Sequence, residues 1–268
     1  GLSTKGVSNT FKGTMFPFFY NDLASFKKSL SKKNNIGLVI MEPMRGDEPK
    51  KNFLKEIRKI TKKNNILLIF DEITSGFHEN FGGLHLKYNI RPDIAIFGKA
   101  LGNGYPISAI LGKKKIMSAA QNTFISSTMW TENIGFSAAN ATLNKMKQHN
   151  VQKKLVLYGK KIKKGWLKSA KKHGLNIKVS GLDSIPSLKF NYKNHLEIST
   201  FFTQEMLKKG FLANTTLATT FAYNDKIINK YLNEIDKFFL KLKKTMEKKE
   251  KIPLNGPIKH DTFRRLTK

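Results

Sequence analysis

Residues 67–77 read Leu-Leu-Ile-Phe-Asp-Glu-Ile-Thr-Ser-Gly-Phe. An apolar run opens this stretch and stops abruptly at two carboxylates, Asp71 and Glu72. A short run without polar interruption is typical of a strand that is buried on both faces. Ligands gather at the carboxyl ends of such strands in parallel sheets. The stretch therefore predicts an acidic side chain at the edge of a functional site.

Similar apolar runs lie on both sides of this stretch. They predict strands over 36–41, 66–70, 94–97 and 107–111, and a helical pattern over 53–60 separates the first two. Strands that alternate with helices and are apolar throughout favour a mostly parallel sheet. We therefore expect an α/β fold in which helices cover both faces of the sheet.

The second half of the chain has a different pattern. Helices are predicted over 132–147, 151–172, 196–208 and 225–248, and short strands over 176–179 and 184–190. This order indicates a smaller α+β domain over residues 149–248. Residues 249–268 form a basic tail with Pro253, Gly256 and Pro257, and we expect a loosely held extension there rather than a core element.

Composition excludes several classes of site. The 268 residues include no cysteine, which excludes disulfides, thiolate zinc sites and cysteine nucleophiles and suits a reducing compartment. The formal net charge is +30, but the lysines are spread along the chain. A solvated basic surface is therefore favoured over a polyanion site. We expect no membrane span, no metal site and no specific nucleic-acid partner.

Three features that can carry chemistry follow predicted strands. Asp71 and Glu72 end the strand described above, Glu42 leaves the strand before it, and Lys99 lies in a glycine-rich turn after the third strand. We expect all of them to project from one edge of the sheet. A partly desolvated lysine amine can attack a carbonyl, and a buried aspartate needs a cationic partner.

This ordered set resembles the class III aminotransferase family. Residues 67–77 are similar to its LLIFDEV.TGF motif, residues 91–107 to its PD…GK.lGgG.P motif, and residues 41–43 to its earlier Glu-Pro. The resemblance implies the pyridoxal-phosphate (PLP)-dependent transferase fold of type I, with residues 1–148 as the C-terminal part of the large PLP-binding domain. The glutamate-1-semialdehyde aminomutase-like branch is the most similar. Residues 126–132 look like a subgroup associated with amino-sugar or surface-polysaccharide pathways.

The resemblance also implies roles for three residues at the cofactor. Lys99 would hold PLP as an internal aldimine and then move a proton between the substrate Cα and the cofactor C4′. Asp71 would pair with the pyridinium nitrogen and keep it protonated. Ile73 stands where the family has valine and would pack against the face of the ring.

Other implied roles concern the substrate and a second subunit. Thr128 matches a position that binds the phosphate of the neighbouring subunit's PLP, and Ser127 and Thr131 remain alternatives for this role. Glu42 would support the substrate side. Family members are homodimers with active sites at the subunit interface, so a homodimer is expected for the full-length protein. A cytoplasmic location is also expected, because no segment of this sequence directs it elsewhere.

Two departures from the family pattern stand out. His78 replaces an arginine that usually follows the Gly-Phe of the motif. The family also has a long upstream stretch with a Ser-Gly-Thr phosphate loop and an aromatic that stacks on the cofactor, and nothing before Phe11 resembles these. We therefore expect an N-terminally truncated chain that binds PLP poorly by itself.

The functional hypothesis is PLP-dependent amino-group transfer on a small amino acid, semialdehyde or keto-sugar, with a small-molecule amino donor or acceptor. The alternative within the family is glutamate-1-semialdehyde 2,1-aminomutase, in which the amino group moves within one molecule. A third hypothesis keeps the fold without catalysis, as a basic binding protein that uses the charge of +30.

Overall fold

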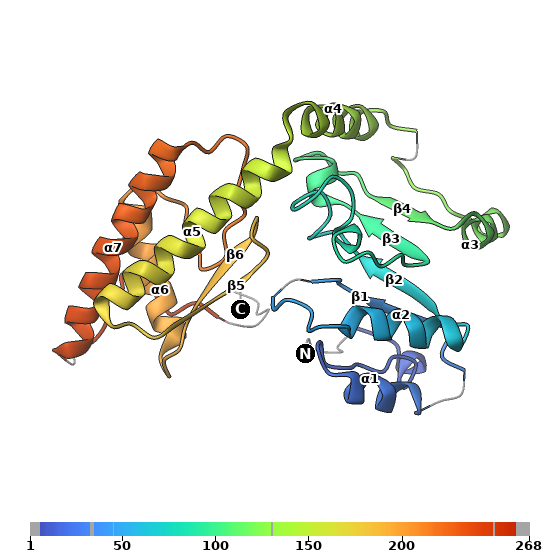
Figure 1. The fold of residues 1–268 in the computed structure, drawn as a ribbon, viewed down its shortest axis with the longest axis horizontal. Coiled ribbons are helices and arrows are strands. Elements are labelled where there is room, and N and C mark those ends of the chain that lie inside the picture. Colours follow the sequence, from blue (N-terminus) through green and yellow to red (C-terminus); the bar gives the residue numbers. More distant parts are fainter. Residues whose placement is uncertain (1–5, 33–34, 45, 130, 249, 261–268) are drawn as a thin grey trace. The chain divides into compact units, whose positions relative to one another are not determined.

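The structure is a computed structural model that describes residues 6–32, 35–44, 46–129, 131–248 and 250–260. The chain divides into two compact units (Figure 1). The N-terminal unit holds the described residues of 8–153. The C-terminal unit holds those of 154–268 together with residues 6 and 7.

A four-stranded sheet forms the centre of the N-terminal unit. Its strands are β1 (Leu38–Met41), β2 (Leu67–Asp71), β3 (Ile94–Phe97) and β4 (Ala109–Gly112), and they lie in that order (Figure 1). The pairs β1–β2 and β2–β3 are parallel, and β4 runs antiparallel to β3. The predicted α/β fold with a mostly parallel sheet is confirmed. The carboxyl ends of the first three strands meet at one edge.

The α-helices of this unit are α1 (Leu23–Leu30), α2 (Phe53–Lys63), α3 (Lys114–Met117) and α4 (Ile134–His149). Four short 3-10 helices are η1 (Asn9–Phe11), η2 (Leu84–Leu86), η3 (Lys99–Leu101) and η4 (Ser118–Asn122). The apolar face of α2 packs into the core, as its helical spacing predicts. Helix α1 was not among the predicted elements. Its N-cap Asp22 accepts a hydrogen bond from the Ser25 backbone N–H.

The two faces of the sheet differ, because side chains alternate along each strand. One face is buried against α1 and α2 and includes Val39, Met41, Leu68 and Phe70. Residues of the other face are half-buried or exposed: Leu38, Ile40, Leu67, Ile69, Ile94, Ile96 and Ile110. The prediction that helices cover both faces is therefore wrong for the described residues. Aliphatic composition shows that side chains suit burial, but it does not identify what covers them.

Asp93 joins several elements just before β3. Its carboxylate accepts hydrogen bonds from Arg58 of α2 at 2.6 and 3.4 Å, from Lys113 Nζ at 2.5 Å, and from the Leu68 backbone N–H at 2.9 Å. Burial alone would raise the pKa of Asp93, but these hydrogen bonds lower the pKa to about 2. The carboxylate thus ties α2, β2 and the end of β4 to the start of β3.

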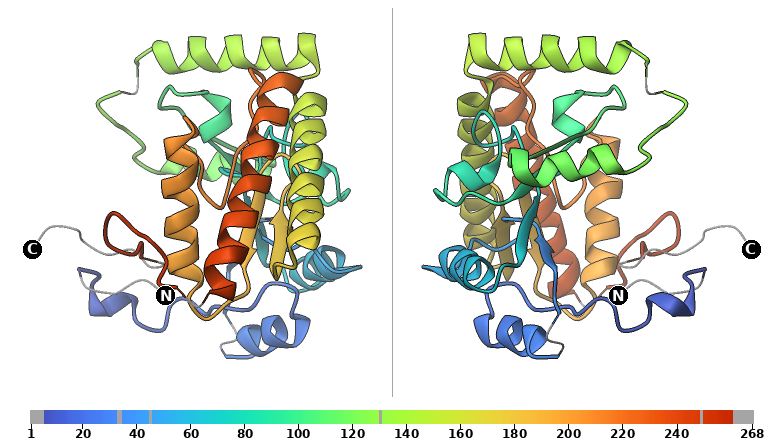
Figure 2. Two further views of the ribbon diagram at one scale, coloured as in Figure 1. Left: turned by 90° about the vertical axis from the view of Figure 1, so that its left-hand side faces the viewer. Right: turned by 90° about the vertical axis from the view of Figure 1, so that its right-hand side faces the viewer.

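The C-terminal unit is a small α+β structure, as predicted. The long helix α5 (Val151–His173) leads into it, followed by the antiparallel strands β5 (Ile177–Gly181) and β6 (Pro186–Phe190) and the helices α6 (His195–Lys208) and α7 (Asp225–Glu247). Figure 2 shows α7 running alongside α5 and α6. Its core contains Trp166, whose indole N–H donates to the hydroxyl of Tyr231 at 3.1 Å.

The tail is held more firmly than the sequence predicts. Ile252 is only 5% exposed and belongs to the core of the C-terminal unit. The side-chain amide of Gln204 in α6 donates to the Pro253 carbonyl at 2.9 Å and accepts from the Asn255 N–H at 2.7 Å. The expectation of a loosely held extension is therefore wrong for residues 250–260. The prolines prevent regular secondary structure in the tail, but the side chain of Gln204 in α6 satisfies backbone groups of Pro253 and Asn255.

Candidate active site

The candidate site lies at the carboxyl ends of β1, β2 and β3. Asp71 is the last residue of β2 and pairs in register with Ile96 of β3. Lys99 follows β3 after a single glycine and begins η3. Glu42 follows β1 directly and is half-buried. All three residues therefore lie at one edge of the sheet, as the sequence predicts.

Asp71 and Ile73 are fixed by the turn that leaves β2. One carboxylate oxygen of Asp71 accepts a hydrogen bond from the Ile73 backbone N–H at 3.0 Å. The side chain of Ile73 lies over Gly98, because a methyl group added at residue 98 would be 3.5 Å from Ile73 Cγ2. The residues that leave β2 therefore contact those that leave β3, immediately before Lys99.

Lys99 has an unusual backbone conformation. Its φ of 42° lies in the left-handed region, which costs a residue other than glycine about 1–3 kcal/mol and is common at functional sites. The side chain is exposed, and Nζ donates a hydrogen bond to the Thr74 hydroxyl at 2.9 Å. Thr74 was not among the predicted site residues, because it stands at the unspecified place of the LLIFDEV.TGF motif.

Glu72 has a different environment from Asp71, although the two are adjacent. Its side chain is wholly buried and accepts hydrogen bonds from the Ser75 hydroxyl, the His85 ring and the backbone N–H groups of Leu84 and His85, at 2.6–2.9 Å. Burial alone would raise the pKa of Glu72, but these hydrogen bonds outweigh it and lower the pKa. Glu72 thus anchors the turn and does not face a ligand.

His78 lies in the same turn as Thr74. Its ring Nδ1 is buried and has no hydrogen-bond partner among the described residues. Burial lowers the pKa of His78, the neighbouring Glu79 acts in the opposite direction, and the charge of Lys99 lowers the pKa further. The structure therefore places this departure from the family pattern within electrostatic reach of Lys99.

The segment before α4 carries the remaining predicted site residues. Thr128 and its alternatives Ser127 and Thr131 are all exposed. Within the described ranges, no hydrogen bond or ion pair joins these three residues to Lys99 or Asp71. The structure thus brings together Lys99, Asp71, Ile73 and Thr74, with Glu42 at the end of the neighbouring strand, and within the described residues it shows no bond from Thr128 to them.

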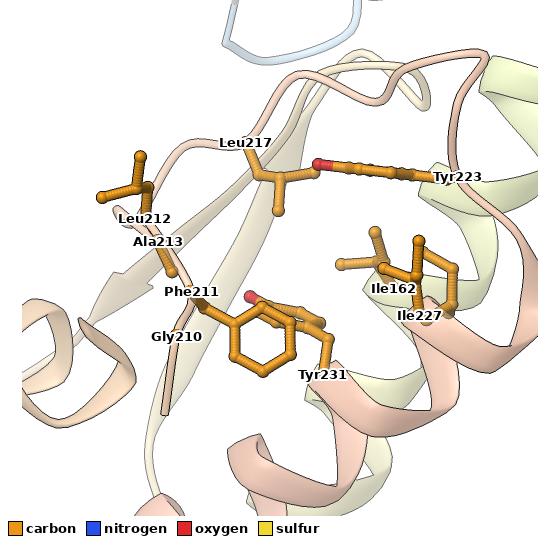
Figure 3. Close-up of a pocket in the computed structure, with 10 residues that line it drawn as sticks. Ile162, Gly210, Phe211, Leu212, Ala213, Leu217, Tyr223, Ile227 and Tyr231 are labelled. Carbon is orange, nitrogen blue, oxygen red and sulfur yellow. The ribbon is translucent and has the colours of Figure 1, made fainter. Parts of the chain in front are cut away.

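A pocket of about 310 Å³ lies in the C-terminal unit (Figure 3). Its polar side-chain atoms are the hydroxyl groups of Tyr223 and Tyr231, and burial raises the pKa of both tyrosines. The pocket lining includes no carboxylate, amine or imidazole that could exchange protons near neutral pH. The pocket is therefore not the candidate site. Its lining consists of Ile162, Gly210, Phe211, Leu212, Ala213, Leu217, Tyr223, Ile227, Ile228 and Tyr231.

The described part of the chain offers neither a metal-binding cluster nor a membrane-spanning helix. It contains no cluster of three or more histidine, aspartate or glutamate side chains that could bind a metal ion. It also contains no helix with the length and apolar character to cross a membrane.

The side chains at the sheet edge suit an aromatic aldehyde with a basic ring nitrogen. Lys99 offers an accessible amine that can condense with the aldehyde. Asp71 offers a fixed carboxylate that can pair with a protonated ring nitrogen, and Ile73 offers an apolar surface next to both. The donor set therefore fits PLP.

Comparison with known proteins agrees with this chemistry. The profile of the family "Aminotransferase class-III" matches residues 19–246. The glutamate-1-semialdehyde 2,1-aminomutase of Thermodesulfovibrio yellowstonii is 30% identical over 259 residues, which cover 88% of this chain and 61% of that protein. The protein of the same name from Nitrosopumilus maritimus is 41% identical over 156 residues, or 54% of this chain and 37% of that protein.

Solved structures share the fold. The FumI protein of Sphingopyxis sp. MTA144, in its PLP internal aldimine form, superposes with a TM-score of 0.78 at 24% identity, covering 86% of this chain and 58% of that protein. The acetylornithine aminotransferase of Elizabethkingia anophelis gives a TM-score of 0.75 at 26% identity, covering 83% and 61%. The chain spans about three fifths of the length of the first curated relative. The expected fold, the PLP-dependent transferase fold of type I, is confirmed.

Proposed function

This chain belongs to the class III aminotransferase family, and from that premise we propose that it carries the cofactor-anchoring part of an enzyme that transfers amino groups with PLP. The observation that carries the proposal is the meeting of Lys99, Asp71 and Ile73 at the carboxyl ends of β2 and β3. The substrates are small molecules, as in the rest of the family.

Each of these residues has a role that follows from its chemistry. The Lys99 amine would hold the cofactor through its aldehyde carbon and, when free, would accept a proton from the substrate Cα. The Asp71 carboxylate pairs with the protonated ring nitrogen. Ile73 supports the ring by apolar contact. The cofactor, when bound, supplies an electron sink for the substrate's Cα electrons. Glu42 supports the substrate side from the end of β1.

Two reactions fit this machinery. In intermolecular transfer, the amino group passes to a second small molecule, such as a semialdehyde or a keto-sugar. In the glutamate-1-semialdehyde 2,1-aminomutase reaction, the group moves within one molecule, and two curated relatives at 30% and 41% identity carry that name. An assay with glutamate-1-semialdehyde, set against glutamate plus keto-sugar nucleotides, distinguishes the two reactions.

A homodimer is also part of the proposal, with Thr128 binding the phosphate of the partner's cofactor. Its support is the exposure of Thr128 and of its neighbour Ser127, which leaves both hydroxyls accessible to a second chain. Sedimentation at several concentrations, with and without PLP, tests the proposal. A cytoplasmic location stays a prediction, which immunoblotting of cell fractions would test.

Reductive trapping tests the cofactor site even if binding is weak. The protein is incubated with PLP and sodium cyanoborohydride, so that an amine adds to the aldehyde carbon, water leaves, and hydride reduces the C=N bond to a stable secondary amine. Peptide mass spectrometry then locates the label. We expect Lys99 to be labelled faster than the other lysines, and Asp71→Asn to slow its labelling.

The control for this experiment is Lys12→Ala, which removes an exposed lysine outside the site and should change nothing at Lys99. Labelling of Lys99 at the average rate of the other lysines would contradict the proposal. Salt-sensitive binding of nucleic acid that is unaffected by Lys99→Ala would instead support the basic binding-protein alternative.

A further inference from the structure

Two adjacent hydroxyl groups in the turn after β2 serve different partners. The Ser75 hydroxyl donates to the buried carboxylate of Glu72 at 2.6 Å. The Thr74 hydroxyl accepts from Lys99 Nζ at 2.9 Å. One hydroxyl therefore belongs to the internal framework of the turn, and the other reaches the amine of the candidate site.

The framework fixes the place of Thr74. The Gly76 N–H donates to the Glu72 carbonyl at 2.8 Å, which closes the turn around Ile73, Thr74 and Ser75. The Glu72 side chain is itself bound by four donors, so the start of the turn has little freedom. Gly76 is also packed tightly, because a methyl group there would lie 2.7 Å from the Phe97 ring. The Thr74 hydroxyl is therefore presented from a rigid support.

Lys99 needs such a partner because its side chain is long and exposed. A lysine has several rotatable bonds, and ordering it costs up to about 2 kcal/mol of side-chain entropy. The left-handed backbone fixes where the side chain starts, and the Thr74 hydroxyl fixes where it ends. The amine donates an N–H to the hydroxyl oxygen, which leaves the lone pair of a neutral amine free for attack on a carbonyl.

We propose that Thr74 is a positioning residue for Lys99, holding its amine beside the turn that carries Asp71 and Ile73. The proposal rests on the proposed function, because it gives a role to Thr74 only if Lys99 is the reacting amine. A carboxylate in the same place would favour the charged ammonium group. A hydroxyl orients the nitrogen without adding a negative charge.

The test compares three variants by reductive trapping with PLP and sodium cyanoborohydride. Thr74→Val keeps the shape and removes the acceptor, Thr74→Ser keeps a hydroxyl, and Thr14→Val changes an exposed threonine whose hydroxyl donates to the Phe11 carbonyl. The readout is the initial rate of labelling at Lys99, divided by the mean rate at the other lysines in the same digest. This ratio is independent of enzymatic turnover and of protein concentration.

Thr74→Val should lower the ratio about 3- to 10-fold, the effect of losing one hydrogen bond, whereas Thr74→Ser should stay within about twofold of the wild type. Thr14→Val should leave the ratio unchanged. Thermal melting of each variant shows whether it folds, and Thr74→Ala provides a second variant without the acceptor if Thr74→Val is unstable.

Three results would overturn the inference, and they differ in what else they affect. A wild-type ratio for Thr74→Val would remove the role of Thr74 and leave the proposed function intact. Equal losses in Thr74→Val and Thr74→Ser would show that the residue matters for packing rather than as an acceptor. No preference for Lys99 in the wild type would overturn both proposals.

Discussion

The half-buried ring of His85 contacts the buried carboxylate of Glu72, with Nδ1 2.8 Å from Oε1. This contact joins the turn after β2 to η2, so the side chain next to the candidate site residue Asp71 holds the surrounding loop together. Asp71 and Glu72 are adjacent in the family motif, but Asp71 bonds to the Ile73 backbone at the candidate site and Glu72 binds the surrounding loop.

Glu72→Gln should therefore destabilise the protein without removing any of the candidate-site side chains, such as Lys99 and Asp71. The amide keeps one acceptor oxygen, but its NH₂ group would face one of the two backbone N–H groups, of Leu84 or His85, that now donate to the carboxylate. We expect a loss of about 3 kcal/mol in the free energy of unfolding, measured by urea titration. Glu48→Gln makes the same charge change at an exposed position and should have an effect below about 0.5 kcal/mol.

The Asp93 cluster should make stability depend on acid pH. The folded pKa of about 2 lies below the ordinary value of 3.8, so the contribution is present above pH 4 and is lost as the pH falls toward 2. Asp93→Asn should remove about 1–2 kcal/mol of stability at neutral pH and flatten the dependence in this window. Urea unfolding at several pH values checks both effects. An equally steep dependence in the variant would contradict the assignment.

His78 should respond to the charge of Lys99. Because the lysine charge disfavours a second positive charge nearby, Lys99→Met should raise the pKa of His78. Lys99→Arg keeps the charge and serves as the control. NMR titration of the imidazole C–H signals gives the pKa directly, and His78→Gln identifies the signal among six histidines. An unchanged midpoint in Lys99→Met would show that the two groups are not coupled.

The tail should contribute to the stability of the C-terminal unit. Ile252→Ala removes a side chain that is 5% exposed and should cost about 2–4 kcal/mol, as for other buried isoleucines. Ile258 is 47% exposed, and Ile258→Ala should change stability by less than about 0.5 kcal/mol. Thermal unfolding of both variants tests the difference. Equal melting temperatures would mean that residues 250–260 are only loosely held.

Much of the fold could be predicted because its signals are local. The apolar run that ends at Asp71 has the length and composition of a buried strand, and α2 has apolar residues at helical spacing until Asn64. The helix α1 was missed, because eight residues give too short a pattern. The buried position of Ile252 was missed because Pro253 indicates a loop and because the core residues that surround Ile252 lie far away in the sequence.

The candidate site divides in the same way. The placement of Lys99 and Asp71 at one edge of the sheet could be predicted, because Asp71 ends one apolar run and Lys99 follows the next after a single glycine. Thr74 could not be, because a hydroxyl in a turn most often bonds within that turn, as Ser75 does here. Only the fold shows that this side chain reaches the next strand's lysine. The exposure of one face of the sheet could not be predicted either, because Leu38 and Ile40 are residue types that usually lie in the core.

Asp93 and Lys99 stand at opposite ends of β3, one before its first residue and one shortly after its last. The hydrogen-bonded cluster of Asp93 and the proposed reactive amine of Lys99 thus lie at different ends of one short strand. Substitutions around Asp93 could raise stability to heat or acid, while substitutions around Lys99 could change which amines are accepted. Within the described residues, no hydrogen bond or ion pair joins Asp93 to Lys99, so stabilising changes at the two ends should combine additively.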